Sequence, residues 1–214
     1  MKSFFITGAT GFIGQRLLEA LDGEVRVLSR KGQKKYETVV CDLKFDEIPN
    51  DALNEVDTVF HLAGIAHDMS NQSKMKKLYK KVNVDSTIKL AELAMRSEVK
   101  NFVFVSSVKA GGLPLNEKCL NEENQGEPDS IYGQTKRAAE LRLLEMSSNS
   151  KMRISIIRPA LVYGPNIKGN LEMMLLGIKK GWFPPLPDNF NKRSMIHVDD
   201  LVRAILLVAQ KSSS

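Results

Sequence analysis

The stretch Thr7-Gly8-Ala9-Thr10-Gly11-Phe12-Ile13-Gly14 decides the fold of this chain. It follows the apolar run Phe4-Phe5-Ile6 and opens a helical pattern of apolar residues that continues to Leu21. A strand, a glycine turn and a helix start, in this order, are typical of a dinucleotide site. The glycines allow a tight turn and let a pyrophosphate approach backbone N–H groups at the helix N-terminus. A glycine turn without a ligand is the competing interpretation, because short motifs of this kind also occur without function.

Composition indicates a globular chain with one main domain. The 214 residues are 43% hydrophobic and 26% charged, so folding should bury roughly 70% of the surface of the unfolded chain. The net charge of +6 and the pI near 9.2 suit an anionic small molecule. The lysines are scattered and form no basic stripe interleaved with aromatic residues, so we expect no nucleic acid partner.

Cysteine and histidine usage predicts neither a metal site nor a disulfide framework. The only cysteines are Cys41 and Cys119, without C-x-x-C spacing, and His61, His67 and His197 form no ligand cluster. Two unpaired cysteines favour a reducing, cytoplasmic compartment. The chain shows no signal-peptide pattern at its start and no apolar run near the ~18 residues that a membrane span needs.

The second expected strand, residues 24–28, ends at Ser29-Arg30. A carboxylate at this place would bind the ribose hydroxyl of NAD, whereas an arginine can neutralise the 2′-phosphate of NADP. No acidic residue follows until Glu37, so the sequence favours NADP and leaves NAD as the second choice. The alternative for Arg30 is a solvated loop residue.

Strand and helix patterns alternate along the whole chain and predict an α/β fold with a doubly wound, Rossmann-like parallel sheet. The fourth strand ends in the small residues Ala63-Gly64, which leave room for a ligand at the carboxyl end of the sheet. Further strands are expected over residues 38–41, 58–62, 101–107 and 153–157, and further helices over 48–54, 73–95, 131–145, 170–180 and 199–209.

Tyr132 and Lys136 are four residues apart, so on a helix they lie on one face. A phenol with a solution pKa of about 10 is a poor base at neutral pH, but a neighbouring ammonium lowers its pKa and suits it to general acid–base work. Ser107, at the end of an adjacent strand, would hold the same substrate oxygen. Taken alone, the pair could equally be an ordinary helix pair.

These motifs together resemble the extended short-chain dehydrogenases/reductases, in particular the NAD-dependent epimerase/dehydratase group that acts on nucleotide sugars. The resemblance covers essentially the whole chain in the family's order. Besides the glycine turn and the Tyr-x-x-x-Lys pair, the matching motifs are Asp42-Leu43, His61-Leu62-Ala63-Gly64, Asn83-Val84, Ser106-Ser107, Arg158-Pro159 and Arg193-Ser-Met-Ile-His197-Val-Asp-Asp.

The resemblance implies an enzyme that transfers a hydride at C4 of a nucleotide sugar, as an epimerase or a 4-keto reductase. The implied catalytic residues are Ser107, Tyr132 and Lys136, and Ser107, Asn170 and Arg193 would bind the substrate. The implied cofactor-binding residues are Gly8, Thr10, Gly11, Phe12, Ile13, Gly14, Ser29, Arg30, Asp42, Leu43, Leu62, Ala63, Gly64, Asn83, Tyr132, Lys136 and Pro159.

The same resemblance implies a dinucleotide-binding domain over residues 1–165 and a substrate-binding part over 166–214, and it allows a homodimer. The chain departs from the family at three places. Ser29-Arg30 replaces the usual acid for NAD, and Ser107-Val108-Lys109-Ala110-Gly111 resembles relatives that work on N-acetylated UDP-hexoses. The C-terminal part, ending at Lys211-Ser-Ser-Ser, looks incomplete relative to the family.

Two other classes of function stay open at this point. A dinucleotide-binding sensor or scaffold would keep the glycine turn but would not need the tyrosine–lysine pair. A nucleic-acid-binding protein would use the lysine-rich helix pattern around residues 74–81 and would show steeply salt-dependent affinity. A solvated helix face explains those lysines equally well.

Overall fold

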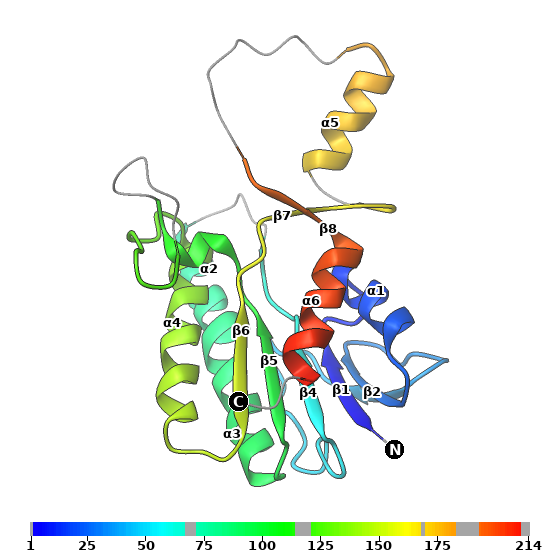
Figure 1. The fold of residues 1–214 in the computed structure, drawn as a ribbon, viewed down its shortest axis with the longest axis vertical. Helices are drawn as coiled ribbons and strands as arrows, with labels where there is room; N and C mark the ends of the chain where they lie inside the picture. Colours follow the sequence, from blue (N-terminus) through cyan, green and yellow to red (C-terminus); the bar gives the residue numbers. More distant parts are fainter. Residues whose placement is uncertain (1, 67–71, 114–120, 168–169, 183–192, 211–214) are drawn as a thin grey trace.

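The computed structural model describes residues 2–66, 72–113, 121–167, 170–182 and 193–210 (Figure 1). The described chain alternates between strands and helices, and six of its strands form one central sheet. The expected α/β class is therefore confirmed.

The central sheet has six parallel strands in the order β3-β2-β1-β4-β5-β6. Neighbouring strands pair in parallel register, for example Thr7 with His61 across β1 and β4. The order changes direction beside β1, and this reversal between β1 and β4 is where doubly wound sheets open a ligand crevice at their carboxyl edge. The strands are β1 (Ser3–Thr7), β2 (Glu24–Ser29), β3 (Glu37–Val40), β4 (Thr58–His61), β5 (Asn101–Val105) and β6 (Arg153–Ile157).

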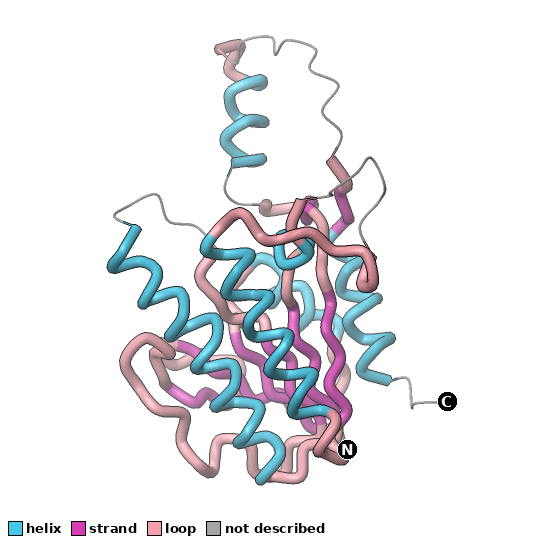
Figure 2. The backbone as a smooth tube through the Cα atoms, turned by 90° about the vertical axis from the view of Figure 1, so that its left-hand side faces the viewer, coloured by secondary structure: helices cyan, strands magenta, loops and turns pink. Residues whose placement is uncertain are grey.

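Helices cover both faces of this sheet (Figures 1 and 2). One face of the sheet packs against α3 (Ser86–Arg96) and α4 (Ile131–Ser147), and Phe102 and Phe104 of β5 are fully buried on this face. The other face packs under α1 (Phe12–Ala20) and α6 (Val198–Gln210). Alternate residues of β5 thus enter different cores, which is why the strand reads as a continuous apolar run.

The helix expected over residues 73–95 is interrupted. It divides into α2 (Gln72–Tyr79), a π-helical segment η1 (Lys80–Asp85) and α3. The π segment widens the turn that carries Asn83, whose side chain is 1% exposed. Such insertions inside α-helices often accompany functional positions, and apolar periodicity does not reveal them.

The helix expected over residues 48–54 is wrong, because this segment forms consecutive turns. The backbone N–H groups of Ala52, Asn54 and Val56 each bond to a carbonyl three residues earlier. Glu55 then adopts a positive φ of 63°, which a continuing right-handed helix does not allow. The apolar residues of this segment are nevertheless buried against β1 and β4, so the apolar pattern correctly indicated buried side chains.

A small second sheet lies beyond the carboxyl edge of the main one. It pairs β7 (Leu161–Tyr163) with β8 (Met195–His197), and α5 (Asn170–Lys179) extends beyond it (Figure 1). The following helix α6 returns to the main sheet, where Leu201, Val202 and Ile205 join the core with Phe4 and Ile6. The expected C-terminal part, residues 166–214, therefore contributes α6 to the packing of the sheet, while its role in substrate binding stays a prediction.

Candidate active site

The glycine turn after β1 has the geometry of an anion cradle. Gly8 has a φ of +73°, and a Cβ atom there would lie 2.8 Å from the backbone nitrogen of Ala63. The N–H of Gly11 donates to the carbonyl of Gly8 at 3.0 Å and closes the turn. Gly11 caps α1 without a side-chain hydrogen bond, and the first turn of α1 carries no acidic residue. Backbone N–H groups and the helix dipole are therefore presented to an anion.

A cleft of about 360 Å³ opens directly over this turn. It lies between the carboxyl ends of β1, β2 and β4. Most of the residues that the sequence assigned to cofactor binding line it, and the residues that the sequence did not anticipate are Leu28, Cys41, Lys44, Ile65 and Val82. The predicted residues in its lining are Gly8, Thr10, Gly11, Ser29, Arg30, Asp42, Leu43, Leu62, Ala63 and Gly64.

The charges of this cleft favour an anionic ligand. Arg30 and Lys44 contribute two cations, and Asp42 contributes one carboxylate. One oxygen of Asp42 accepts a hydrogen bond from the backbone N–H of Lys44 at 3.0 Å. The glycine cradle, the uncapped helix start and the surplus of positive charge fit a dinucleotide pyrophosphate.

Asn83 uses its amide to hold the loop after β4 in place. Its Oδ1 accepts from the backbone N–H of Ile65 at 2.8 Å, and its Nδ2 donates to the Ile65 carbonyl and to Thr135 Oγ1, both at 3.1 Å. The side chain thus joins the cleft wall to α4. Any contribution of Asn83 to cofactor binding would act through this loop.

Lys136 borders the same cleft from inside the protein. Its side chain is 3% exposed, and its Nζ donates to the carbonyl of Val105 at 2.9 Å. The ammonium also lies 4.5 Å from the centre of the Phe104 ring. Burial lowers the pKa of Lys136 to about 8, while Glu140 acts in the opposite direction. At neutral pH the group is still mostly protonated, so it carries charge into a nearly dry site.

Ser107 and Tyr132 meet across the gap between β5 and α4. Ser107 follows the strand, which ends at Val105, and caps the short 3-10 helix η2 (Val108–Gly111) by accepting from the N–H of Lys109 at 3.2 Å. Tyr132 lies in the first turn of α4, where Ser130 caps the helix. The Ser107 hydroxyl lies close enough to Tyr132 to lower the pKa of the phenol. The serine, the tyrosine and the lysine are therefore held together by three neighbouring elements.

The electrostatic expectation for Tyr132 needs a correction. A lowered pKa was expected from the neighbouring ammonium, but burial raises the pKa of Tyr132 above its ordinary value, and only the hydrogen bond with Ser107 lowers it. The reason is that the Lys136 ammonium is turned to Val105 and the Phe104 ring. Tyr132 is thus a neutral phenol at neutral pH, which suits proton donation.

His61 is a structural residue that connects the glycine strand to the π segment. Its Nδ1 lies 2.6 Å from Thr7 Oγ1, and its Nε2 lies 2.8 Å from Thr87 Oγ1. Thr87 donates its own hydrogen to the carbonyl of Asn83, so His61 must donate to Thr87 from Nε2. Burial lowers the pKa of His61 to about 3, which keeps the ring neutral in this network.

The remaining predicted site residues lie at the border of the cleft or outside the described contacts. Phe12 and Ile13 form the first turn of α1, where Ile13 packs against the core, and Gly14 is buried. The carbonyl of Pro159 accepts from Val108 at 3.1 Å. Asn170 begins α5 with its side chain outside the described part, and Arg193 is exposed just before β8. Cys119 and His67 also lie outside the described residues.

The described segments contain neither a metal-ligand cluster nor a membrane-spanning helix. No three His, Cys, Asp or Glu side chains there come together as metal ligands. None of the helices in the same segments is long and apolar enough to span a membrane.

The family model for the NAD dependent epimerase/dehydratase family matches residues 4–214. The chain belongs to this family. Its members are described as NAD dependent, which agrees with the dinucleotide cleft. The family membership predicted from the ordered motifs is thereby confirmed.

Two relatives show the same affiliation. A UDP-glucose 4-epimerase of Vibrio cholerae is 33% identical over 217 residues, which cover 96% of this chain and 66% of the relative. An N-acetyl-alpha-D-glucosaminyl-diphospho-ditrans,octacis-undecaprenol 4-epimerase of Escherichia coli O157:H7 is 31% identical over 94% of this chain and 61% of the relative. The chain therefore spans less than two thirds of the length of either relative.

Solved structures agree on the fold. MoeE5 in complex with UDP-glucose and NAD superposes with a TM-score of 0.84 at 27% identity, covering 97% of this chain and 72% of that one. A UDP-N-acetylglucosamine 4-epimerase from Methanobrevibacter ruminantium M1 gives a TM-score of 0.86 at 24% identity, covering 100% and 74%. The Rossmann-like assignment is thereby confirmed.

Proposed function

We propose that this epimerase/dehydratase family member transfers a hydride at C4 of a nucleotide sugar, as a 4-epimerase or a 4-keto reductase. The substrate would be a UDP-hexose or a UDP-N-acetylhexosamine. The observation that carries this proposal is that Tyr132 and Lys136 share one face of α4 beside Ser107, with the Lys136 ammonium directly behind Gly64 in the wall of the dinucleotide cleft. The 4-epimerase names of the two relatives support the same substrate class.

The chain's own residues would divide the work at C4 as follows. Tyr132 donates a proton to the C4 oxygen in keto reduction and takes it back in oxidation. A nicotinamide cofactor held in the cleft would supply the hydride chemistry. Ser107 holds that oxygen by a hydrogen bond. The neutral phenol found here suits the reductive direction directly, and the oxidative direction needs the Lys136 charge to face the phenol.

The cofactor of this protein would be NADP(H), with NAD(H) as the alternative. Arg30 and Lys44 line the cleft together with Ser29 at the end of β2, where a 2′-phosphate would lie in a dinucleotide bound to this fold. MoeE5 is described with NAD, so the proposed preference would set this chain apart from that relative. Direct titration with both dinucleotides decides between them.

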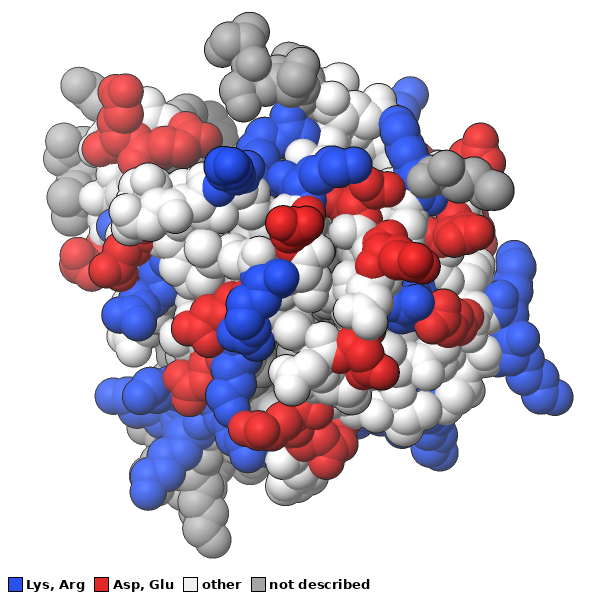
Figure 3. All heavy atoms as spheres, turned by 90° about the horizontal axis from the view of Figure 1, so that it is seen from below, with Lys and Arg blue, Asp and Glu red and all other residues white. Residues whose placement is uncertain are grey.

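Binding of the nucleotide diphosphate is proposed for Asn170 and Arg193, at the start of α5 and just before β8. A homodimer in the cytoplasm is proposed on family resemblance alone. Nucleic acid is not the proposed partner: positive and negative side chains alternate over the face at the amino edge of the sheet (Figure 3), and ion pairs such as Lys100–Asp57 and Arg26–Glu37 neutralise lysine and arginine there.

The test is to incubate the protein with UDP-hexoses, UDP-N-acetylhexosamines and their 4-keto forms, each with NADPH, NADH or the oxidised cofactors, and to identify the products by mass spectrometry and NMR. An inverted C4 configuration identifies an epimerase, and a reduced 4-keto sugar with consumption of NAD(P)H identifies a reductase. Cofactor binding without any product would instead favour the dinucleotide-binding sensor or scaffold.

A further inference from the structure

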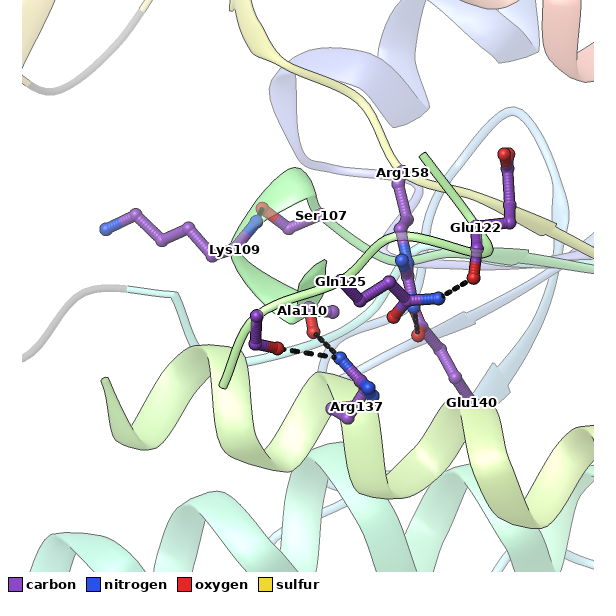
Figure 4. Close-up of polar contacts among 9 residues, drawn as sticks. Ser107, Lys109, Ala110, Glu122, Gln125, Arg137, Glu140 and Arg158 are labelled. Carbon is purple, nitrogen blue, oxygen red and sulfur yellow. Dashed lines mark hydrogen bonds and ion pairs between the residues drawn. The ribbon is translucent and has the colours of Figure 1, made fainter. Parts of the chain in front are cut away.

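A buried ion pair lies beneath the proposed catalytic residues. Glu140 on α4 has a side chain that is only 2% exposed, and Arg158 reaches it from the end of β6 (Figure 4). Arg158 Nε lies 2.9 and 3.1 Å from the two carboxylate oxygens, and its Nη2 contacts Oε2 as well. Burying such a pair costs desolvation that its attraction often fails to recover, so stability alone is a weak reason for it.

The position of Glu140 along α4 connects it to the active site. It follows Lys136 by four residues and Tyr132 by eight, so all three lie along one face of the helix. Lys136 is almost fully buried, and its Nζ donates a hydrogen bond to the neutral Val105 carbonyl. A buried ammonium needs a compensating charge, and Glu140 supplies the neighbouring carboxylate.

The other end of the pair reaches the strand that supports Ser107. The two neighbours of Arg158 in the chain bind the turn after β5 through their carbonyl groups. The Ile157 carbonyl accepts from the N–H of Ser106 at 2.7 Å, and the Pro159 carbonyl accepts from the N–H of Val108 at 3.1 Å. The ion pair thus ties the helix of Tyr132 and Lys136 to the backbone that holds Ser107.

We propose that Glu140, fixed by Arg158, is a positioning residue that serves as the counter-charge of the Lys136 ammonium and sets the spacing between Ser107 and Tyr132. The importance of this role for catalysis rests on the proposed function. The effect of Glu140 on the titration of Lys136 is a property of the protein alone and can be measured without turnover.

Among the residues that the structure describes, the other ionisable groups around Lys136 do not supply this charge. His61 on β4 is held neutral by burial and interacts with Lys136 only by repulsion if protonated. Tyr132 on α4 is a neutral phenol whose pKa burial raises, and Tyr79 on α2 raises that pKa further. Arg158 is a cation that holds Glu140 in place and supplies no negative charge.

The experiment measures the titration midpoint of Lys136 by NMR of the protein with ¹³C-labelled lysine side chains, the signal being assigned by its loss in Lys136→Met. Glu140→Gln keeps the size and a hydrogen-bonding group but removes the charge. We expect the Lys136 midpoint to fall by about 1 pH unit or more, as for the loss of a close opposite charge. Glu145→Gln, an exposed change on the same helix beside Arg142, should leave it unchanged.

A double variant allows the same test if Glu140→Gln does not fold. Glu140→Met combined with Arg158→Leu replaces the pair by apolar side chains of similar size, a change that buried pairs often tolerate. This double variant should lower the Lys136 midpoint, as Glu140→Gln does. Glu140→Asp, which keeps the carboxylate, should have a midpoint between those of Glu140→Gln and the wild type. An unchanged midpoint in Glu140→Gln, or in the double variant where the single one does not fold, overturns the proposal. Failure to find any sugar turnover would contradict the proposed function and leave this result standing.

Discussion

A Cβ atom built on Gly64 would lie 3.4 Å from the Nζ of Lys136 and 3.2 Å from the Oδ1 of Asn83. The cleft wall and the buried ammonium are therefore in van der Waals contact range, with only a glycine between them. This closeness places the proposed catalytic lysine at the dinucleotide site, although Lys136 itself belongs to a helix on the other side of the wall.

We expect Gly64→Val to weaken dinucleotide binding at least tenfold, because its side chain would press on Lys136 and Asn83 behind the cleft wall and displace that wall. The dissociation constant can be measured by the fluorescence of bound NADPH. Gly32→Val is a matched control, since a Cβ atom there meets nothing within 4 Å. Equal affinity of both variants would show that the dinucleotide does not occupy this cleft.

The glycines of the first turn should separate into two classes. A Cβ atom at Gly14 would lie 2.3 Å from the carbonyl oxygen of Gly8, whereas one at Gly11 would meet that atom at 3.1 Å. Gly14→Ala should therefore destabilise the fold by about 1–3 kcal/mol, as overpacking does. Gly11→Leu should leave the melting temperature nearly unchanged and abolish dinucleotide binding. Retained binding in Gly11→Leu would contradict the pyrophosphate assignment.

The cofactor preference depends on Arg30. Arg30→Ala should weaken NADPH binding by about 1.5–3 kcal/mol, the value of a hydrogen bond to a charged group, and leave NADH binding nearly unchanged. Isothermal titration with both dinucleotides measures the difference. Lys31→Ala, which removes the neighbouring cation, serves as the control. Tighter binding of NADH than of NADPH by the unmodified protein would reverse the assignment.

The sequence predicted the parts of the site that depend on local order along the chain. The glycine turn, the small residues after β4 and the Tyr132–Lys136 spacing each have a local signature, and the alternation of strand and helix patterns predicted the sheet. The π segment around Asn83 was not predicted, because the apolar pattern of residues 73–95 was interpreted as one continuous helix. The turns at 48–54 carried the apolar pattern of a helix, and only tertiary burial decided their backbone.

Charges that are paired across the fold were equally hidden. A glutamate four residues after Lys136 has the sequence pattern of an exposed helix residue. The residues around Glu140 in the sequence do not indicate that Arg158 binds and covers it. The direction of the Tyr132 pKa also depended on where the Lys136 ammonium points, which is set by Val105 and Phe104 on β5. Side-chain direction and burial are properties of the packed structure, so spacing along a helix is not sufficient to derive them.

The buried charge of Lys136 should appear in the pH dependence of stability. Burial lowers its pKa from 10.5 to about 8, so between these values the unfolded chain holds a proton that the folded chain has lost. Stability must then rise with pH across this window. Relative to Lys136→Met, the wild type should gain on the order of 3 kcal/mol from pH 8 to 10.5, measured by urea unfolding. A constant difference between the two proteins would show that Lys136 titrates normally.

The chemical role of Tyr132 can be isolated by removing one oxygen atom. Tyr132→Phe keeps the ring in its partly buried place beside Ser107 but cannot give or take a proton. Turnover of the sugar identified in the substrate panel should therefore fall by ~10²–10⁴, the usual contribution of a general acid–base group. The affinity for the dinucleotide should change little, since the cleft is lined by other residues.

The neutral phenol also predicts how activity depends on pH. Because burial raises the pKa of Tyr132, keto reduction should continue at neutral pH, and oxidation of the C4 hydroxyl should rise as the pH rises. Ser107→Ala removes the hydrogen bond that lowers this pKa, so the oxidative limb should move to higher pH in that variant. Both limbs can be followed by the absorbance of the reduced nicotinamide. A Tyr132→Phe variant that keeps its rate within a few-fold of wild type would show that Tyr132 does not transfer the proton. The C4 oxygen would then need a different proton donor.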